Sequence, residues 1–374
     1  MAKLIDITGK ALSGEWGTDD ESGDGILVLR TTNFTNEGVV NYNDVVTRTI
    51  TKKNIDEKFL RKGDIIIEKS GGSDKFPVGR VIYFDGDENT YLFNNFTGLL
   101  RVKDQDAWYP RYVFYSLFAN YKRGGTRAFE NKTTGLHNLK TDDYVSRYEV
   151  AETDKAEQIS ICDKLDRLYG IIKSREKELQ LLDDLIKARF VEMFGDPDTN
   201  PMNWDTYRLD ECYEIASSKR ILKSEWKSEG IPFLRVRDMV QLATTGQMDN
   251  EFYVSEEFYS TLKDTDGIPR ANDILVSATS TLGKCHIVNE GERFYFKDAD
   301  VLRFRAKKDI NPVFFVEQMK SSYIEEQIAR TLGVTTVAHF TIKAAKTINM
   351  RLPDITLQNQ FADFVRQIDK SKVA

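Results

Sequence analysis

The sequence predicts an α+β protein with two repeated mixed domains that are separated by long, antiparallel coiled-coil helices. Three observations support this prediction. A set of short segments occurs twice in the same order, an apolar heptad pattern runs between the two copies, and the start of that pattern is repeated near the end of the chain. The 374 residues suffice for two domains of ordinary size. With 40% hydrophobic and 30% charged residues, each domain can bury a core.

The repeated segments are offset from each other by 202 to 209 residues. The clearest match aligns residues 25–34 with residues 230–239. Four further matches follow in the same order and pair residues 63–67 with 272–276, 79–80 with 283–284, 100–102 with 302–304, and Pro110 with Pro312. Matches that keep one order along the chain indicate a duplicated domain rather than chance similarity.

Within each copy, short aliphatic runs separated by Gly, Asp and Asn predict strands joined by turns. In the first copy these runs are residues 26–29, 65–67, 81–83 and 99–102. Segments rich in aromatic residues then predict one helix in each copy, at residues 111–121 and 312–327. Each copy is therefore expected to be a mixed α+β domain of about 150 residues.

A long helix is expected between the two copies. Apolar residues recur there at the alternating spacings of a coiled-coil seam, at Ile161, Leu165, Leu168, Ile172, Leu179, Leu182, Ile186 and Met193. Gly195 and Pro197 then provide the signals that end a helix. A helix of about 40 residues with a single apolar seam needs a partner helix to be stable.

The end of the chain supplies a candidate for this partner. Gln158 and Leu165 align with Gln358 and Val365, so the start of the long helix is also repeated. This repetition favours pairing within one chain, and a coiled coil between two chains is the alternative. The expected organisation is a first domain at residues 1–152, a central helix at 153–196, a second domain at 197–352 and a short C-terminal helix at 353–374.

Two segments carry a resemblance to a known family. Residues 190–197 read Phe-Val-Glu-Met-Phe-Gly-Asp-Pro and are followed by Asn-Pro-Met-Asn-Trp at 200–204, while residues 357–365 read Leu-Gln-Asn-Gln-Phe-Ala-Asp-Phe-Val. With the duplicated domains, they resemble the specificity subunits of type I restriction-modification systems over nearly the whole chain. The resemblance implies two target-recognition domains that each read half of a split site on double-stranded DNA. It also implies helices that dock DNA methyltransferase subunits, with restriction subunits joining through the complex.

The chain departs from this family pattern in its C-terminal helix, which is much shorter than the central one. This favours, as an alternative, a truncated or recombined specificity protein that binds DNA without full assembly. The net charge of −6 favours a third class, an elongated scaffold that does not bind DNA, because phosphate contacts need cations. The acidity is concentrated in residues 151–200, however, which hold 8 basic and 12 acidic residues.

The sequence lacks the motifs of methyl transfer and of ATP use. It has no Asn-Pro-Pro-aromatic or Asp-Pro-Pro-aromatic tetrapeptide and no Walker loop. Asp64, Glu68 and Lys69 come nearest to a nuclease motif but have the wrong spacing, and the three histidines are scattered. We therefore expect a non-catalytic recognition subunit that is not an enzyme and uses no cofactor or metal.

Cysteine usage and hydropathy bear on location. Cys162, Cys212 and Cys285 are far apart and odd in number, which is typical of free thiols in a reducing cytoplasm. The sequence has no apolar run of the length that crosses a membrane. A cytoplasmic location is therefore expected.

Base reading needs polar side chains on loops or helix ends, with further cations on phosphates. Residues of these types gather in two stretches of the first domain and recur at matched places in the second. The DNA-binding candidates are Lys122, Arg123, Arg127, Lys132, Thr133, Thr134, Ser70 and Lys75 in the first domain, and Lys219, Arg220, Arg235, Arg237, Ser280, Thr281, Lys284, Thr335 and Thr336 in the second.

Overall fold

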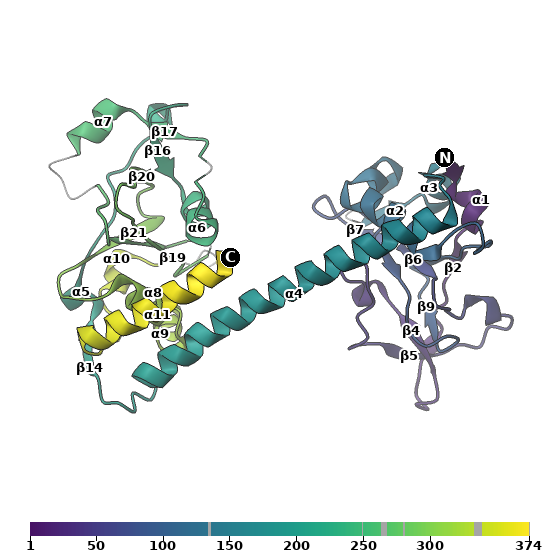
Figure 1. Ribbon diagram of the computed structural model, residues 1–374, viewed down its shortest axis with the longest axis horizontal. Helices are drawn as coiled ribbons and strands as arrows, with labels where there is room; N and C mark the ends of the chain where they lie inside the picture. Colours follow the sequence, from purple (N-terminus) through teal and green to yellow (C-terminus); the bar gives the residue numbers. More distant parts are fainter. Residues whose placement is uncertain (134–135, 249, 263–267, 280, 333–338, 374) are drawn as a thin grey trace. The chain divides into compact units, whose positions relative to one another are not determined.

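The computed structural model describes residues 1–133, 136–248, 250–262, 268–279, 281–332 and 339–373. The chain divides into two compact units, Met1–Ser174 and Arg175–Ala374. The division falls inside one long helix, α4 (Lys155–Phe194), which agrees closely with the predicted central helix. Both units are mixed α+β structures, as the sequence predicts (Figure 1).

The first unit ends at Ser174 and therefore includes the first half of α4. Its elements are β1 (Ala2–Lys3), α1 (Leu4–Thr8), β2 (Leu12–Ser13), β3 (Thr18–Asp19), β4 (Ile26–Leu29), η1 (Thr31–Asn33), β5 (Val46–Thr49), η2 (Asp56–Lys58), β6 (Ile65–Glu68), β7 (Ser70–Gly72), β8 (Val81–Tyr83), β9 (Tyr91–Phe93), β10 (Thr97–Leu100), α2 (Pro110–Lys122), η3 (Gly125–Phe129), β11 (Glu130–Thr133), β12 (Leu136–Leu139), α3 (Thr141–Arg147) and β13 (Glu149–Val150). The predicted strands at 26–29, 65–67 and 81–83 are thus confirmed.

The centre of this unit is an antiparallel sheet of strand order β2-β10-β6-β8. Its middle strand β6 is buried on both faces, since α2 covers one face and the sheet β3-β5-β4-β9 packs near the other. A third sheet, of order β11-β12-β7, extends from the end of β6. Because both faces of β6 are buried, residues 65–67 are all aliphatic and do not alternate between apolar and polar side chains.

The second unit contains the remaining half of α4 and everything after it. Its elements are β14 (Asp205–Arg208), α5 (Leu209–Cys212), β15 (Tyr213–Ala216), η4 (Lys223–Glu225), β16 (Ile231–Leu234), α6 (Val236–Thr245), β17 (Tyr253–Val254), α7 (Glu256–Thr261), β18 (Ile274–Ser277), β19 (Cys285–Ile287), β20 (Tyr295–Phe296), β21 (Val301–Ala306), α8 (Pro312–Met319), α9 (Ser322–Leu332), α10 (Ile342–Ala345), β22 (Asn349–Leu352) and α11 (Ile355–Val373). Its central antiparallel sheet has the order β15-β21-β18-β19, which matches that of the first unit strand for strand.

One of the predicted repeat alignments is wrong by two residues. Ile65 pairs with Leu100 across the first sheet, whereas Ile274 pairs with Phe304 across the second. The structural equivalent of Leu100 is therefore Phe304 and not Leu302. Residues two apart on a strand face the same side, so a sequence pattern alone does not distinguish these two registers.

A buried ion pair fixes the corrected register in both units. Arg101 donates to both carboxylate oxygens of Asp64 at 2.7 and 2.6 Å. Arg305 does the same to Asp273 at 2.9 and 2.7 Å. Both aspartates are buried at the start of the middle strand, and such two-pronged contacts restrict the geometry strongly.

The helix predicted at residues 312–327 is two helices in the structure. α8 ends at Met319, and α9 begins at Ser322. Between them, the Lys320 and Ser321 amides bond to the carbonyls three residues earlier, which is the geometry of a tight turn. Ile324 and Ile328 of α9 are buried beside α8, so the apolar pattern continues although the helix axis does not.

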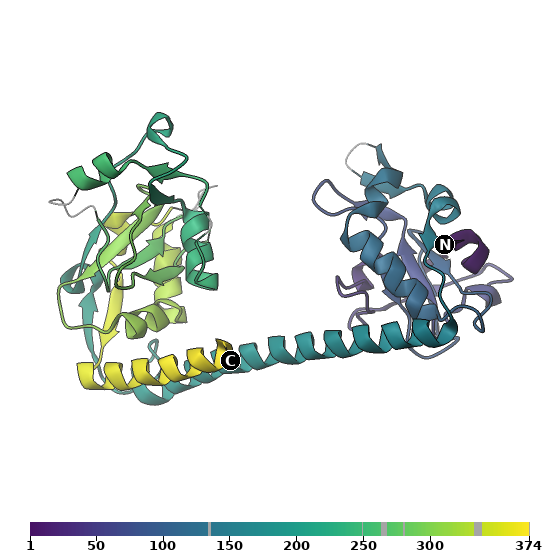
Figure 2. The same ribbon diagram turned by 45° about the horizontal axis from the view of Figure 1, so that its top comes forward.

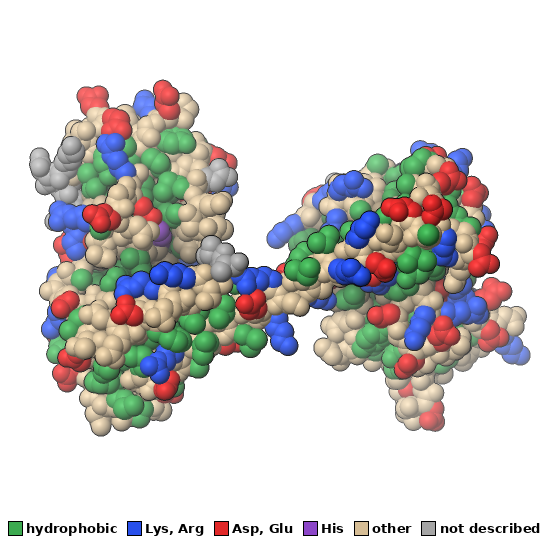
Figure 3. All heavy atoms as spheres, viewed as in Figure 1, with side chains coloured by type: hydrophobic (Ala, Val, Ile, Leu, Met, Phe, Trp, Pro, Cys, Tyr) green, Lys and Arg blue, Asp and Glu red, His purple; other side chains and the backbone are tan. Residues whose placement is uncertain are grey.

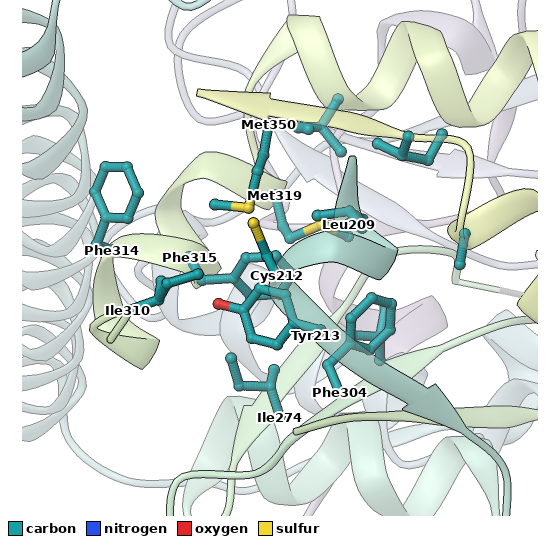
Figure 4. Packing of buried hydrophobic residues seen from close by; sticks show 14 of the residues in the cluster. Leu209, Cys212, Tyr213, Ile274, Phe304, Ile310, Phe314, Phe315, Met319 and Met350 are labelled. Atoms are coloured by element: carbon teal, nitrogen blue, oxygen red, sulfur yellow. The ribbon is translucent and has the colours of Figure 1, made fainter. Parts of the chain in front are cut away.

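The core of the second unit joins its sheet to the helices. Figure 4 shows Tyr213, Phe304 and Phe315 packed together, with Met319 and Met350 beside them. Phe190 and Phe194 of α4 lie against Phe314 and Phe361, with ring centroids 4.9 to 5.6 Å apart. The second half of α4 is therefore part of this core.

The predicted pairing of the two helices within one chain is confirmed, and the helices are antiparallel (Figure 2). Arg175 donates to the Lys372 carbonyl at 3.0 Å, while Phe190 packs on Phe361 further along α4. α11 thus covers residues 175–194 of α4 only. In the first half of α4, Leu168, Ile171 and Ile172 are exposed.

Among the described residues, no helix is long and apolar enough to span a bilayer. Cys162, Cys212 and Cys285 are free thiols, as predicted from their spacing.

Candidate nucleic-acid interface

In both units, the predicted loops emerge at one edge of the central sheet. In the first unit β6 ends at Glu68, and β8 and β10 begin at Val81 and Thr97, so the connections at these points share an edge. In the second unit the end of β18 and the starts of β19 and β21 form the equivalent edge. Loops on one edge of a rigid sheet can contact one ligand together.

The structure brings together the two candidate stretches of the first unit. β7, which carries Ser70, pairs with β12, and β12 pairs with β11. Arg127 donates to the carbonyls of Asp74 and Lys75 at 3.2 and 3.5 Å. The sequence separates these segments by about fifty residues, whereas hydrogen bonds join them into one surface. We call residues 69–80, with η3, β11 and β12, the first edge surface.

Other candidates of the first unit lie at the end of α2. Lys122 and Arg123 are exposed, with the Lys122 ammonium over the Phe118 ring and the Arg123 guanidinium donating to the Ala119 carbonyl. Both side chains are exposed to solvent next to η3. Thr134, Ser280, Thr335 and Thr336 lie outside the described residues, as do the side chains of Lys132 and Thr133.

In the second unit, Lys219 and Arg220 are exposed just beyond β15. The Tyr295 hydroxyl holds the backbone there, since it accepts from the Lys219 amide at 2.7 Å and donates to the Lys219 carbonyl at 3.1 Å. Thr281 and Lys284 are exposed in the loop between β18 and β19. These four residues form the second edge surface.

Two further candidates have their charges locally balanced. Arg235 donates to Asp238 at 2.8 and 3.1 Å and to Glu251 at 3.2 Å, and Arg237 also contacts both acids. Burial opposes ionisation of Asp238, but hydrogen bonds from Arg235 outweigh it and lower the pKa of the carboxyl. Asp238 in turn accepts the Arg235 amide at the start of α6. Arg235 therefore has a structural role at this helix terminus, while the Arg237 side chain is 66% exposed.

Sequence reasoning missed two exposed aromatic residues at this sheet edge, Phe76 on the first edge surface and Phe96 in the turn before β10. Phe76 is 56% exposed and Phe96 is 52% exposed. Phe76 lies in the turn that follows β7, and Phe96 lies in the turn that precedes β10 of the central sheet. Their signal in the sequence is an aromatic residue among Gly, Ser, Asp and Asn, where a core residue is not expected.

A polar cavity of about 280 Å³ lies under the loop that carries Phe76. Glu68 and Arg80 form part of its wall, 3.4 Å apart. Burial raises the pKa of the Glu68 carboxyl, and Arg80 only partly counteracts this.

The nearest approach to a nuclease motif does not form a site. Asp64 is bound by Arg101, Glu68 faces Arg80, and the Lys69 ammonium donates to Ser13. Among the described residues, no group of three or more His, Cys, Asp or Glu could hold a metal ion. His137 and His286 instead contact Glu130 and Glu292 at 3.0 and 2.9 Å.

Two units with the same central-sheet order, each with candidate residues at the equivalent sheet edge, define the class of protein as a duplicated α+β protein with a long connecting helix. Residues 201–374 match the family of the type I restriction modification DNA specificity domain. Over 95 residues the chain is 34% identical to a putative type I restriction enzyme specificity subunit of Haemophilus influenzae. The aligned region covers 25% of this chain and 23% of that protein. The chain thus aligns with about a quarter of the length of this curated relative.

Solved structures share the fold over almost the full chain. A type I restriction-modification S subunit from M. genitalium matches with a TM-score of 0.58 at 17% identity, over 99% of this chain and 89% of that one. A chain from a study of complex assembly and conformational transition of the type I R-M system matches with a TM-score of 0.53 at 16% identity, over 100% and 90%. The resemblance to type I specificity subunits is therefore confirmed, and it rests on the family match of residues 201–374, on the similar specificity subunit and on the shared fold.

Proposed function

We propose that this chain is a sequence-specific DNA-binding specificity subunit of a type I restriction-modification complex, in which each unit reads half of a bipartite target. One observation carries the proposal. The same sheet edge in two equivalent domains bears exposed cationic and small polar side chains, although the loops themselves differ. Equivalent scaffolds with different loops suit the reading of two different half-sites.

The net charge does not oppose this proposal. Lys and Arg side chains are scattered among acidic ones on the visible faces of both units (Figure 3). Lys75 and Lys122 in the first unit, and Lys219 and Arg220 in the second, are exposed and form no ion pair among the described residues. Local cations of this kind are what contacts with phosphate require.

The helices are proposed to dock methyltransferase subunits, through which restriction subunits would join. Leu168, Ile171 and Ile172 on the first half of α4 have exposed apolar side chains. Neighbouring exposed apolar side chains on a helix are typical of a surface that contacts another protein. Catalysis is assigned to those partners. This chain would contribute recognition and spacing, with no cofactor of its own.

Binding of duplex DNA at several salt concentrations tests the proposal. The double variant Lys219→Gln with Arg220→Gln should reduce the slope of log affinity against log salt by about two, because each phosphate contact contributes about one counterion. The matched control is Arg61→Gln with Lys62→Gln, since these exposed cations lie at the opposite edge of the first sheet. This control should leave the slope unchanged.

Different outcomes separate the alternatives. Absence of salt-dependent DNA binding by the purified chain would contradict the proposal and support a scaffold. Binding of DNA without co-purification of a co-expressed type I methyltransferase subunit would support a specificity protein that does not assemble fully.

A further inference from the structure

The loop of residues 73–77 is held by several hydrogen bonds although it lies on the surface. The Ser73 amide donates to the Phe76 carbonyl at 2.7 Å, and the Phe76 amide donates to the Ser73 hydroxyl at 3.2 Å. Arg127 holds the Asp74 carbonyl from η3, and the Val78 amide is bound by Glu130 of β11 at 3.1 Å. Contacts from two other segments therefore fix the loop before any ligand binds.

This fixed loop presents an apolar ring to solvent. Phe76 is 56% exposed, and the Lys75 ammonium lies 5.2 Å from the ring centroid. Pro77 follows and further limits the backbone. Exposing most of a phenyl ring forgoes the stabilisation that its burial would bring, so a loop held in this way that displays one suits a contact made on binding.

The equivalent loop of the second unit is built differently. Ser277 takes the place of Glu68 at the end of the middle strand, and its hydroxyl accepts the Lys284 amide at 2.9 Å. Leu282 of that loop is packed against the core rather than displayed. The displayed aromatic residue is thus a property of the first unit, which would give its half-site a preference that the second half-site lacks.

We propose that Phe76 is a specificity-determining residue of the first unit and reads a thymine through the C5-methyl group. The inference rests on the proposed function. Among the bases, only thymine presents a methyl group in the major groove, and apolar side chains contact it there. The neighbouring Lys75 is placed to contact a phosphate, which would hold the ring at the base edge.

The test combines a change in the protein with a change in the DNA. Selection from a random duplex library first defines the bound motif, and each thymine of that motif is then replaced by deoxyuridine, which lacks only the methyl group. At one thymine, the replacement should weaken binding by the wild-type chain about fourfold, as expected for one buried methyl group. Phe76→Ala should bind the thymine duplex about fourfold more weakly and be insensitive to the same replacement.

Two control variants test whether the sensitivity to deoxyuridine depends on the Phe76 ring. Phe96→Ala removes a ring of similar exposure at the same sheet edge and should retain the full sensitivity to deoxyuridine. Phe76→Leu keeps an apolar side chain and should retain part of it, and thermal melting verifies that each variant is folded. If a motif is selected while Phe76→Ala remains as sensitive as the wild-type chain to deoxyuridine at every thymine, the inference about Phe76 is wrong, but the proposed DNA-binding function is retained. If no motif is selected, the proposed function itself fails.

Discussion

Tyr213 is buried to 1% exposure in the core of the second unit, and its hydroxyl has no hydrogen-bond partner among the described residues. Figure 4 shows this oxygen surrounded by apolar side chains, and burial raises the pKa of the phenol well above its usual value. A buried hydroxyl without a partner loses its hydration and gains nothing in exchange.

Tyr213→Phe should therefore raise the free energy of unfolding by about 1 kcal/mol, because it removes the unpaired group and keeps the ring. Denaturant unfolding monitored in the second unit would measure the change. Tyr295→Phe is the control and should destabilise by a similar amount, since the Tyr295 hydroxyl accepts and donates a hydrogen bond at Lys219. A destabilised Tyr213→Phe would mean that the hydroxyl has a partner.

The junction between each domain and its helix is built in the same way twice. The side-chain Oε1 of Gln158 accepts a hydrogen bond from the Tyr109 backbone amide at 2.8 Å, just before α2. Gln358 accepts the Asn311 amide at 3.0 Å, just before α8. Both glutamines are buried in the first turn of their helices, so each ties a helix start to the helix that covers the sheet.

Replacing either glutamine with alanine should leave the half-buried amide of Tyr109 or Asn311 unpaired and destabilise its own unit by about 1 kcal/mol. Hydrogen exchange would localise the effect, with faster exchange at Tyr109 in Gln158→Ala and at Asn311 in Gln358→Ala. Gln180→Ala on the exposed face of α4 serves as the control. Equal loss of protection in both units from one substitution would contradict independent junctions.

At the scale of the whole molecule, α4 is one continuous helix of 40 residues that begins in the first unit and ends in the second. If each unit reads one half-site, the length of this helix sets the unread gap between them. α11 ends beside Arg175, so an insertion next to Ser174 lies outside the helix pair and needs no matching change in α11.

Inserting one heptad at Ser174 should lengthen α4 by about 10 Å while keeping the apolar seam in phase. Since base pairs are spaced at about 3.4 Å, the unread gap should grow by roughly two to three base pairs. Both half-sequences should stay the same when the target is selected again from a random library. An unchanged gap would show that the helix does not act as the spacer.

Arg235 and Arg237, two of the DNA-binding candidates predicted from the sequence, are poor sites for a charge substitution because both contact Asp238 and Glu251. Arg235 is bound to Asp238 at the start of α6, so its loss would disturb the fold as well as any contact with DNA. Lys219 and Arg220 are better targets because both are exposed and neither forms an ion pair with any other residue that the structure describes.

The sequence by itself indicated the duplication and a long central helix, predicted at 153–196, and it favoured pairing of the two helices within one chain over a coiled coil between two chains. Each of these leaves a periodic or repeated pattern along the chain, because a helix seam and a buried strand impose spacings that can be counted. The resemblance to specificity subunits follows from the same segments, at 190–204 and 357–365.

Only the tertiary structure decided the alignment of Leu100 with Phe304, the neutralisation of Arg235 by Asp238, and the union of Lys75 with Arg127 in one surface. These features depend on pairing between segments that are distant in sequence or on the direction of a single side chain. Strand patterns repeat every two residues and so do not encode register, and a count of cations does not reveal which of them a neighbouring carboxylate already binds.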